Sequence, residues 1–425
     1  MREIKLAGFG KSGRALWEKT KKSLSSFRDG VLPALRKYGD RLLFILALAV
    51  LAAAIIRGGG KKVIAGVAVP SIEFTQWWQD EPGENTLQEL IKEFEKANGG
   101  IRIAVRTVTY GEMRALLFNP SGVFPGDVLA IDPLWAPELL KREVIERAGP
   151  QLLSFINVLY YNVEILKEAG FTRPPKNRSE FLDYARAVKA GGALPARNAL
   201  VRDGNSPRGI YDDVYPWIWA AGARLVKDGE PTLNTRSVTE SLSFLSSLHN
   251  EGLIYSSDAK PEDFISGSAA FMIAPVKQLK VLRQRMGEEA FGITAVPAPD
   301  NYSGKPYYAS IGWSIGVNPG SEHREEARLF AAFLAGKASF LSEQTGAIPG
   351  TASAPPPASD PFRSKAWDIA IAGESAPDFI DMEGEHELEE IFGEELAALF
   401  EGRSSPAEAA GAIQKRWETV MARQN

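Results

Sequence analysis

The chain has 425 residues, of which 44% are hydrophobic and 24% charged, enough for a sizeable core and, at about 150 residues per domain, for more than one domain. It contains no cysteine, which excludes disulfides, thiolate metal sites, cysteine nucleophiles and a lipid-modified cysteine. Residues 1–57 contain 12 basic and 4 acidic residues, a net charge of +8, whereas the remainder carries −12. An acidic body of this kind argues against nucleic acid as a partner.

Residues 42–56 are an unbroken apolar run that follows a basic stretch, 1–41, which we expect to stay in the cytoplasm. As a helix the run would rise about 22 Å, less than the roughly 30 Å of a bilayer core, although flanking arginines could snorkel. The residues Ala52, Ala53 and Ala54 fit a cleavage site. Residues 42–57 are therefore either a signal peptide or a signal anchor, and the long basic stretch favours an uncleaved anchor. Residues 58–65 read as a linker. Because the basic segment is expected to stay in the cytoplasm, the body is expected on the periplasmic side of the cytoplasmic membrane.

The first elements of the body predict a parallel sheet. Residues 63–75 are rich in β-formers, and Thr86 with Glu89 has the spacing of a capping box at the start of a helix. Residues 101–106 largely alternate apolar and polar side chains as a strand does, so strand, helix and strand make a βαβ unit. Residues 127–132 are a nearly unbroken apolar run, as expected for a central strand buried on both faces.

Helices and short strands alternate along the rest of the chain. Helix-start signals with apolar periodicity occur at Ser179, Ser237, Ser321 and Ser405. Strands are predicted at 269–273, 292–296 and 311–317. This alternation is typical of α/β folds and predicts a body of two α/β lobes.

Motifs of catalysis are weak. The run from Gly312 to Gly316 matches the G-x-S-x-G nucleophile elbow, but Ser314 falls inside a predicted strand rather than at a turn before a helix. The three histidines are far apart and have no histidine partner at metal-binding spacing, and there is no P-loop. We therefore predict no catalytic residue, no metal and no cofactor. Paired acids such as Asp127 with Asp132 leave a secreted glycoside hydrolase open as an alternative.

Tryptophans cluster at predicted strand ends and turns. Flat rings beside polar groups are suited to stacking on sugar faces while hydroxyls are held, and ligands of open α/β sheets bind beyond the carboxyl ends of strands. Core packing is the favoured interpretation for Trp217, Trp219 and Trp417. Ligand contact is favoured for Trp78, Trp135 and Trp313.

From about residue 70 to the end, the chain resembles the extracellular solute-binding proteins of bacterial ABC transporters, in the sugar-binding group that includes maltodextrin- and glycerol-phosphate-binding proteins. The most specific stretch is Tyr160-Tyr161-Asn162 followed by Glu168-Ala169-Gly170. The other matching stretches are 72–78, 90–101, 127–135 with its D-V-x-x-x-D-x-x-W pattern, 267–272, 291–297 and 312–317.

The resemblance implies a two-lobed periplasmic-binding-protein fold with a hinge, preceded by an N-terminal membrane helix. Lobe one would comprise about 66–156 and 275–335, and lobe two about 157–274 and 336–425. The function implied is non-catalytic: a monomer that binds a sugar or polyol between its lobes and delivers it to the permease subunits of an ABC transporter. A membrane-tethered solute sensor stays open as a further alternative. The implied ligand-binding residues are Trp77, Trp78, Gln79, Asp132, Trp135, Asn157, Tyr211, Asp213 and Trp313.

One departure concerns the first passage between the lobes. Between Trp135 and Tyr160 there are 24 intervening residues, whereas the family usually has a longer stretch containing a Gly-Lys-x-Tyr-x-x-Pro hinge strand. Gly149-Pro150-Gln151 continues directly into Leu152, as though a segment of the first hinge crossing were missing.

Overall fold

The computed structural model describes residues 70–78, 85–118, 126–146, 151–191, 198–203, 213–308, 311–350, 356, 359–376 and 385–423. All of them belong to one compact unit, Val69–Asn425. The expected cytoplasmic segment, anchor and linker, residues 1–65, lie outside the described residues. In the described part, no helix is both long and apolar enough to cross a bilayer.

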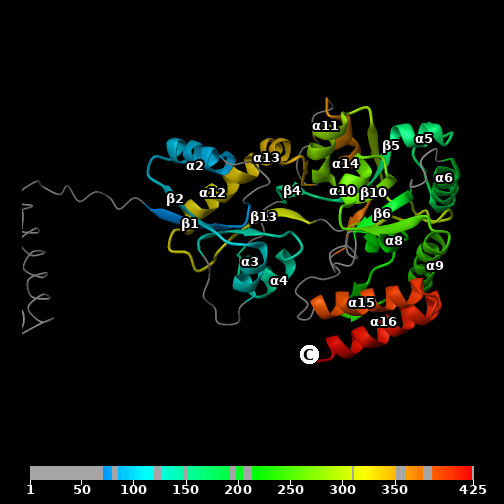
Figure 1. Ribbon diagram of the computed structural model, residues 1–425. Coiled ribbons are helices and arrows are strands. Elements are labelled where there is room, and N and C mark those ends of the chain that lie inside the picture. Colours follow the sequence, from blue (N-terminus) through cyan, green and yellow to red (C-terminus); the bar gives the residue numbers. More distant parts are fainter. Residues whose placement is uncertain are drawn as a thin grey trace, which may run out of the picture. The chain divides into compact units, whose positions relative to one another are not determined.

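A six-stranded mixed sheet organises lobe one (Figure 1). Its order is β14-β4-β13-β3-β1-β2, with β1 parallel to both β2 and β3, and β13 antiparallel to β3. The β1–α2–β2 unit confirms the predicted βαβ arrangement. The strand bounds are β1 Ser71–Gln76, β2 Arg102–Thr107, β3 Val128–Ile131, β4 Leu153–Ser154, β13 Gly312–Val317 and β14 Ile348–Pro349.

Helices cover both faces of this sheet, which explains why β3 and β13 are buried along their whole length. On one face, α2 (Thr86–Ala97) and α12 (Arg324–Gly336) pack through Phe94 and Phe330. On the other face, α3 (Tyr110–Leu117) and α4 (Ala136–Lys141) bury Met113, Leu117 and Leu139 (Figure 1). Helix α13 (Ala338–Thr345) packs against β14 and β4.

A five-stranded sheet of order β11-β5-β10-β6-β9 organises lobe two. Its centre, β10, is antiparallel to β5 and parallel to β6. The bounds are β5 Asn157–Asn162, β6 Asn198–Asp203, β9 Ile254–Ser257, β10 Ala269–Pro275 and β11 Phe291–Thr294.

Two helical layers enclose the five-stranded sheet (Figure 1). One layer is formed by α5 Val163–Glu168, α6 Arg178–Gly191, α8 Tyr215–Ala220, α9 Arg236–Asn250, α15 Glu385–Phe400 and α16 Pro406–Met421. The other is formed by α10 Lys260–Ile265, the 3-10 turn η1 Val276–Gln278, α11 Leu279–Met286 and α14 Pro361–Ala372. Two short ribbons complete the lobe: β7 Val226–Lys227 with β8 Glu230–Pro231, and β12 Tyr307–Tyr308 with β15 Glu374–Ser375.

The chain passes between the sheets three times: from β4 to β5, from β12 to β13, and from β14 to α14. The first passage needs only Phe155 and Ile156 between its strands, so the short β4, paired with both β13 and β14, supplies the crossing that seemed to lack a segment. The first two crossings are bonded to each other, because the amide of Phe155 donates to the carbonyl of Ile311 at 2.8 Å.

Several expectations differ from the structure in detail; for example, the N-cap of α9 is Thr235, not Ser237, and that of α12 is His323, not Ser321. Strand β11 pairs with β5 in lobe two, although 275–335 was expected in lobe one, and α13 with β14 belongs to lobe one although 336–425 was expected in lobe two. The capping box predicted at Thr86 is wrong, because Asn85 is the N-cap of α2 and its side chain makes no capping bond. The box at Ser405 and Glu408 is confirmed.

Candidate functional site

An aromatic group lies where β1, β2 and β3 end in lobe one. Trp77 follows β1, Tyr110 opens α3 just after β2, and Trp135 follows β3. The ring of Trp77 lies 5.4 Å from that of Tyr110 and 5.5 Å from that of Trp135. Tyr110 is 41% exposed and Trp77 is partly exposed, whereas Trp135 is buried beneath them. We call these three residues the Trp77 site, an exposed aromatic surface at the carboxyl edge of the parallel strands.

Asp132 supports this site from below. Its carboxylate is fully buried and accepts bonds from the Tyr110 hydroxyl at 3.2 Å and the Leu134 amide at 2.9 Å. The second bond closes the turn that leads to Trp135. The geometry therefore differs from the expected ligand contact: Asp132 positions both aromatic residues, because its oxygens are turned inward.

Trp78 and Trp313 are stacked on each other, with ring centroids 4.4 Å apart and planes at 11°. Both are buried, at 2% and 1% exposure, so the expectation that their faces contact a ligand does not match their packing. Trp78 also places its edge against Phe74, and Phe155 from the first crossing places its edge against Trp313. The stack thus joins β1 to the crossing segments, and it leaves Trp77 as the exposed member of the Trp77–Trp78 pair.

Asp213 is also buried rather than open to a ligand. Both of its carboxylate oxygens lie 2.9 Å from Nζ of Lys260, which also donates to the carbonyl of Ile273. Asp213 is 2% exposed and Lys260 8%. This ion pair ties the chain before α8 to α10 and β10, which is a structural role.

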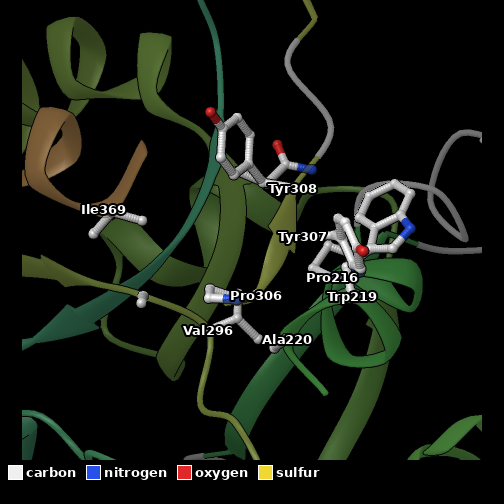
Figure 2. A pocket seen from close by; sticks show the side chains of 10 residues that line it. Pro216, Trp219, Ala220, Val296, Pro306, Tyr307, Tyr308 and Ile369 are labelled. Atoms are coloured by element: carbon white, nitrogen blue, oxygen red, sulfur yellow. The ribbon is translucent and has the colours of Figure 1, made fainter. Parts of the chain in front are cut away.

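Lobe two contains a pocket that is partly open to solvent (Figure 2). Asn157, at the start of β5, is one of the lining residues, and its role in ligand binding stays a prediction. The lining residues are Asn157, Pro216, Trp219, Ala220, Ala295, Val296, Pro306, Tyr307, Tyr308 and Ile369. We call this the Tyr307 pocket.

The two tyrosines of the pocket are held by the β12–β15 ribbon. The carbonyl of Tyr308 accepts from the amide of Ala376 at 2.8 Å, and that of Pro306 accepts from the amide of Glu374 at 2.9 Å. Figure 2 shows Tyr307 near Pro216 and Trp219 of α8, which contacts β12. Burial raises the pKa of Tyr308 above its ordinary value, so its hydroxyl stays a neutral donor.

Two of the expected site residues, Gln79 and Tyr211, lie outside the described residues. Conversely, the sequence reasoning missed Tyr110, Tyr307 and Tyr308, and it assigned Trp219 to the core alone. Trp219 is indeed buried, yet it also lines the pocket. The sequence did contain a signal for two of them: Tyr307 and Tyr308 are adjacent aromatic residues just before the Trp313 strand.

Comparison with known proteins shows the family to which this chain belongs. The model for bacterial extracellular solute-binding proteins matches residues 79–339, more than half of the chain. The chain belongs to this family. A curated relative from Deinococcus radiodurans, named a probable ABC transporter-binding protein, is 27% identical over 189 residues. That alignment covers 42% of this chain and 45% of the relative, so it spans less than half of either protein.

Solved structures of solute-binding proteins share the fold. The sugar-binding protein MalE of Xanthomonas citri has a TM-score of 0.70 at 18% identity, covering 83% of this chain and 98% of its own. The cyclic alpha-maltosyl-1,6-maltose binding protein of Arthrobacter globiformis has a TM-score of 0.69 at 16% identity, covering 83% and 100%. The two-lobed α/β fold is therefore confirmed for this solute-binding protein.

Proposed function

We propose that this solute-binding protein captures a sugar or polyol and delivers it to the permease of an ABC transporter on the outer side of the cytoplasmic membrane. The observation that carries the proposal is the Trp77 site, where exposed aromatic rings meet a buried carboxylate at the carboxyl ends of parallel strands. The family match and the names of similar sugar-binding proteins support it.

In this mechanism the ligand contacts one surface from each lobe. Trp77 and Tyr110 supply exposed aromatic rings in lobe one, and Asn157, Tyr307 and Tyr308 line the pocket in lobe two. The apolar faces of a sugar ring stack on the aromatics while its hydroxyls bond the polar groups. Binding both surfaces at once draws the lobes together about the three crossings.

Binding is favoured over glycoside hydrolysis. A hydrolase would need two carboxylates flanking a sugar, and the two acids that raised this alternative are engaged elsewhere. Asp127 accepts from the Glu73 amide and the Ser321 hydroxyl, and Asp132 accepts from the Tyr110 hydroxyl and the Leu134 amide. The protein is accordingly proposed to act without catalysis, as a monomer held at the membrane by residues 42–56. A tethered solute sensor would share the same site and differ in its partner, so co-purification of a permease separates the two.

Isothermal titration calorimetry and tryptophan fluorescence against a panel of mono- and oligosaccharides test the proposal. We expect at least one sugar to release or absorb heat and to change the emission spectrum. Trp77→Ala should weaken that binding about tenfold or more, because it removes a stacking face. Phe340→Ala is the matched control, since Phe340 is an exposed aromatic of α13 outside both surfaces. Absence of binding to every sugar in the panel would contradict the proposal.

A further inference from the structure

The last turn of the short helix α8 is bound by a buried arginine. The carbonyl of Trp217 accepts from the guanidinium of Arg178, the first residue of α6. The amide of Ala221, which would reach this carbonyl in a regular helix, donates to Ile218 instead. A cationic donor satisfies the carbonyl and complements the negative end of the helix dipole. Arg178 therefore holds the C-terminal end of α8.

In the described part of the chain, the hydrogen-bond partners of the Arg178 side chain are neutral. It also donates to Ser241 Oγ of α9 at 3.0 Å, and its guanidinium carbon lies 5.2 Å from the ring centre of Phe244. Arg178 is 6% exposed, and burial lowers the pKa of its guanidinium to about 10, so it is charged at neutral pH. Lys260, which binds the chain just before α8, has the carboxylate of Asp213 instead. A buried cation without a carboxylate costs free energy, so stability alone does not account for an arginine here.

The backbone around Arg178 is fixed as well. Its amide donates to the carbonyl of Ala298 at 3.0 Å, and the amide of Ser179 donates to the Asp300 carboxylate at 3.2 Å. Residues 298–300 belong to the connection between β11 and β12, the strand that contains Tyr307. The start of α6 thus binds two segments of lobe two: α8 through a side chain, and the β11–β12 connection mainly through the backbone.

These two segments meet at the candidate site. Helix α8 contacts β12, and Figure 2 shows Trp219 of α8 near Tyr307 of β12. Gly222, just after α8, lies against Tyr302 of the β11–β12 connection so closely that a Cβ would overlap the tyrosine hydroxyl. A shift of α8 would therefore change the position of Trp219 relative to Tyr307.

From this arrangement we infer that Arg178 is a positioning residue of the candidate ligand site: it holds α8 against α9 and thereby fixes Trp219 beside Tyr307. Arg178 is not one of the residues that line the Tyr307 pocket, so it acts through α8 rather than by contact with the ligand. The inference rests on the proposed function and adds to it a residue that determines affinity from outside the site.

Hydrogen exchange and titration calorimetry on the full-length protein in detergent test this role. In Arg178→Met, we expect the backbone amides of α8 to exchange faster than in the parent, because a main-chain carbonyl of α8 loses its donor. Amides of α9 should keep the parent rates, because Arg178 binds only a side chain there. The affinity for a sugar, from a panel that includes maltose, maltotriose and tagatose, should fall about tenfold, as it would if α8 kept its place in about one molecule in ten.

Two further variants make the comparison specific. Arg178→Lys keeps a cationic donor, so its affinity and its α8 exchange should lie between those of the parent and Arg178→Met, and it replaces the methionine variant if that one does not fold. Arg186→Met is the matched control, because Arg186 lies on the same helix and also ties α6 to α9, through two bonds of 2.7 Å to Glu251 rather than through α8. It should leave the exchange of α8 and the sugar affinity at the parent values.

The two measurements separate this inference from the broader proposal. Unchanged exchange of α8 in a folded Arg178 variant would overturn the inference, whatever the sugar result. Faster exchange of α8 with the parent affinity would also overturn it, because the position of α8 would then not matter to the ligand. If no sugar of the panel binds the parent, the proposed function fails, and the exchange rates alone decide whether Arg178 holds α8.

Discussion

At the residue scale, the pair of Asp213 and Lys260 is a buried ion pair. Each charge loses most of its hydration, so each depends on the other. Removing one partner leaves an uncompensated charge in a low-dielectric interior, whereas removing both leaves a smaller loss. Asp213 thus contributes to folding rather than to ligand chemistry.

We expect Asp213→Asn to lower the free energy of unfolding by about 3 to 5 kcal/mol, because the buried Lys260 ammonium then faces neutral acceptors and no countercharge. Urea unfolding measures this. Adding Lys260→Met to the variant should restore part of the loss. Lys305→Met is the control, since its exposed pair with Glu374 should contribute about 0 to 1 kcal/mol. A loss below about 1 kcal/mol for Asp213→Asn would contradict this role.

Residue types in the sequence were sufficient to find the aromatic surface but not to orient its members. Trp77 and Trp78 are adjacent in a chain that has just left a strand, so they point to opposite sides, and only the stacking partner decides which one is buried. That partner, Trp313, lies in β13, far along the chain. Asp213 is likewise separated by 47 residues from Lys260, a distance at which spacing carries no information.

At the element scale, the N-terminus of α16 is stabilised by a reciprocal capping box between Ser405 and Glu408. We expect Ser405→Ala to cost about 1 kcal/mol, because one amide at the helix start loses its acceptor. Ser405→Gly should cost only about a few tenths of a kcal/mol, and Glu408→Gln should preserve the capping box. Thermal and urea unfolding rank the three variants, and equal losses for alanine and glycine would contradict the assignment.

Arg363 ties α14 of lobe two to the segment that ends lobe one. Its guanidinium donates to Ser342 Oγ at 2.5 Å and to the Ala347 carbonyl at 3.2 Å, while Asp360 caps α14 and binds Arg283. Burial lowers the pKa of Arg363, although the group remains charged at neutral pH. Both ends of the third crossing are therefore bound to each other.

Arg363→Met should lower the free energy of unfolding by about 1 to 3 kcal/mol, since the Ala347 carbonyl loses a buried donor. Lys365→Met on the exposed side of α14 is the control and should change it by less than about 0.5 kcal/mol. Denaturant titration with both variants provides the comparison. Equal effects of the two substitutions would show that Arg363 does not bind the crossing.

At the scale of the whole molecule, alternating helix and strand signals were enough to predict two α/β lobes. The βαβ start, the buried β3 and the strand position of Ser314 follow from local patterns. Local patterns do not show which sheet each strand joins. The sequence of β11 is that of any short apolar strand, and only its antiparallel register with β5 places it in lobe two. Lobe boundaries are therefore set by long-range pairing.

A ligand that bridges the lobes should stabilise the entire fold. At a sugar concentration of about 100 times the dissociation constant, the expected gain is about 2.7 kcal/mol, which corresponds to a rise of a few degrees in the unfolding midpoint. Differential scanning calorimetry measures it. The double variant Trp77→Ala and Tyr308→Ala should lose this rise at the same sugar concentration, and an undiminished shift would mean that the ligand binds elsewhere.

The outer strand of the lobe-one sheet, β2, bears on how the protein behaves at high concentration. Among the described residues it pairs with β1 alone, and Val105 is 43% exposed on it. Arg102 and Arg106 lie on the same strand and pair with Glu95 and Glu73. Charges on an edge strand oppose its pairing with the same edge of a second molecule. Arg102→Val with Arg106→Val should therefore promote strand-to-strand association, seen as mass growth in light scattering, so these arginines protect solubility rather than the fold.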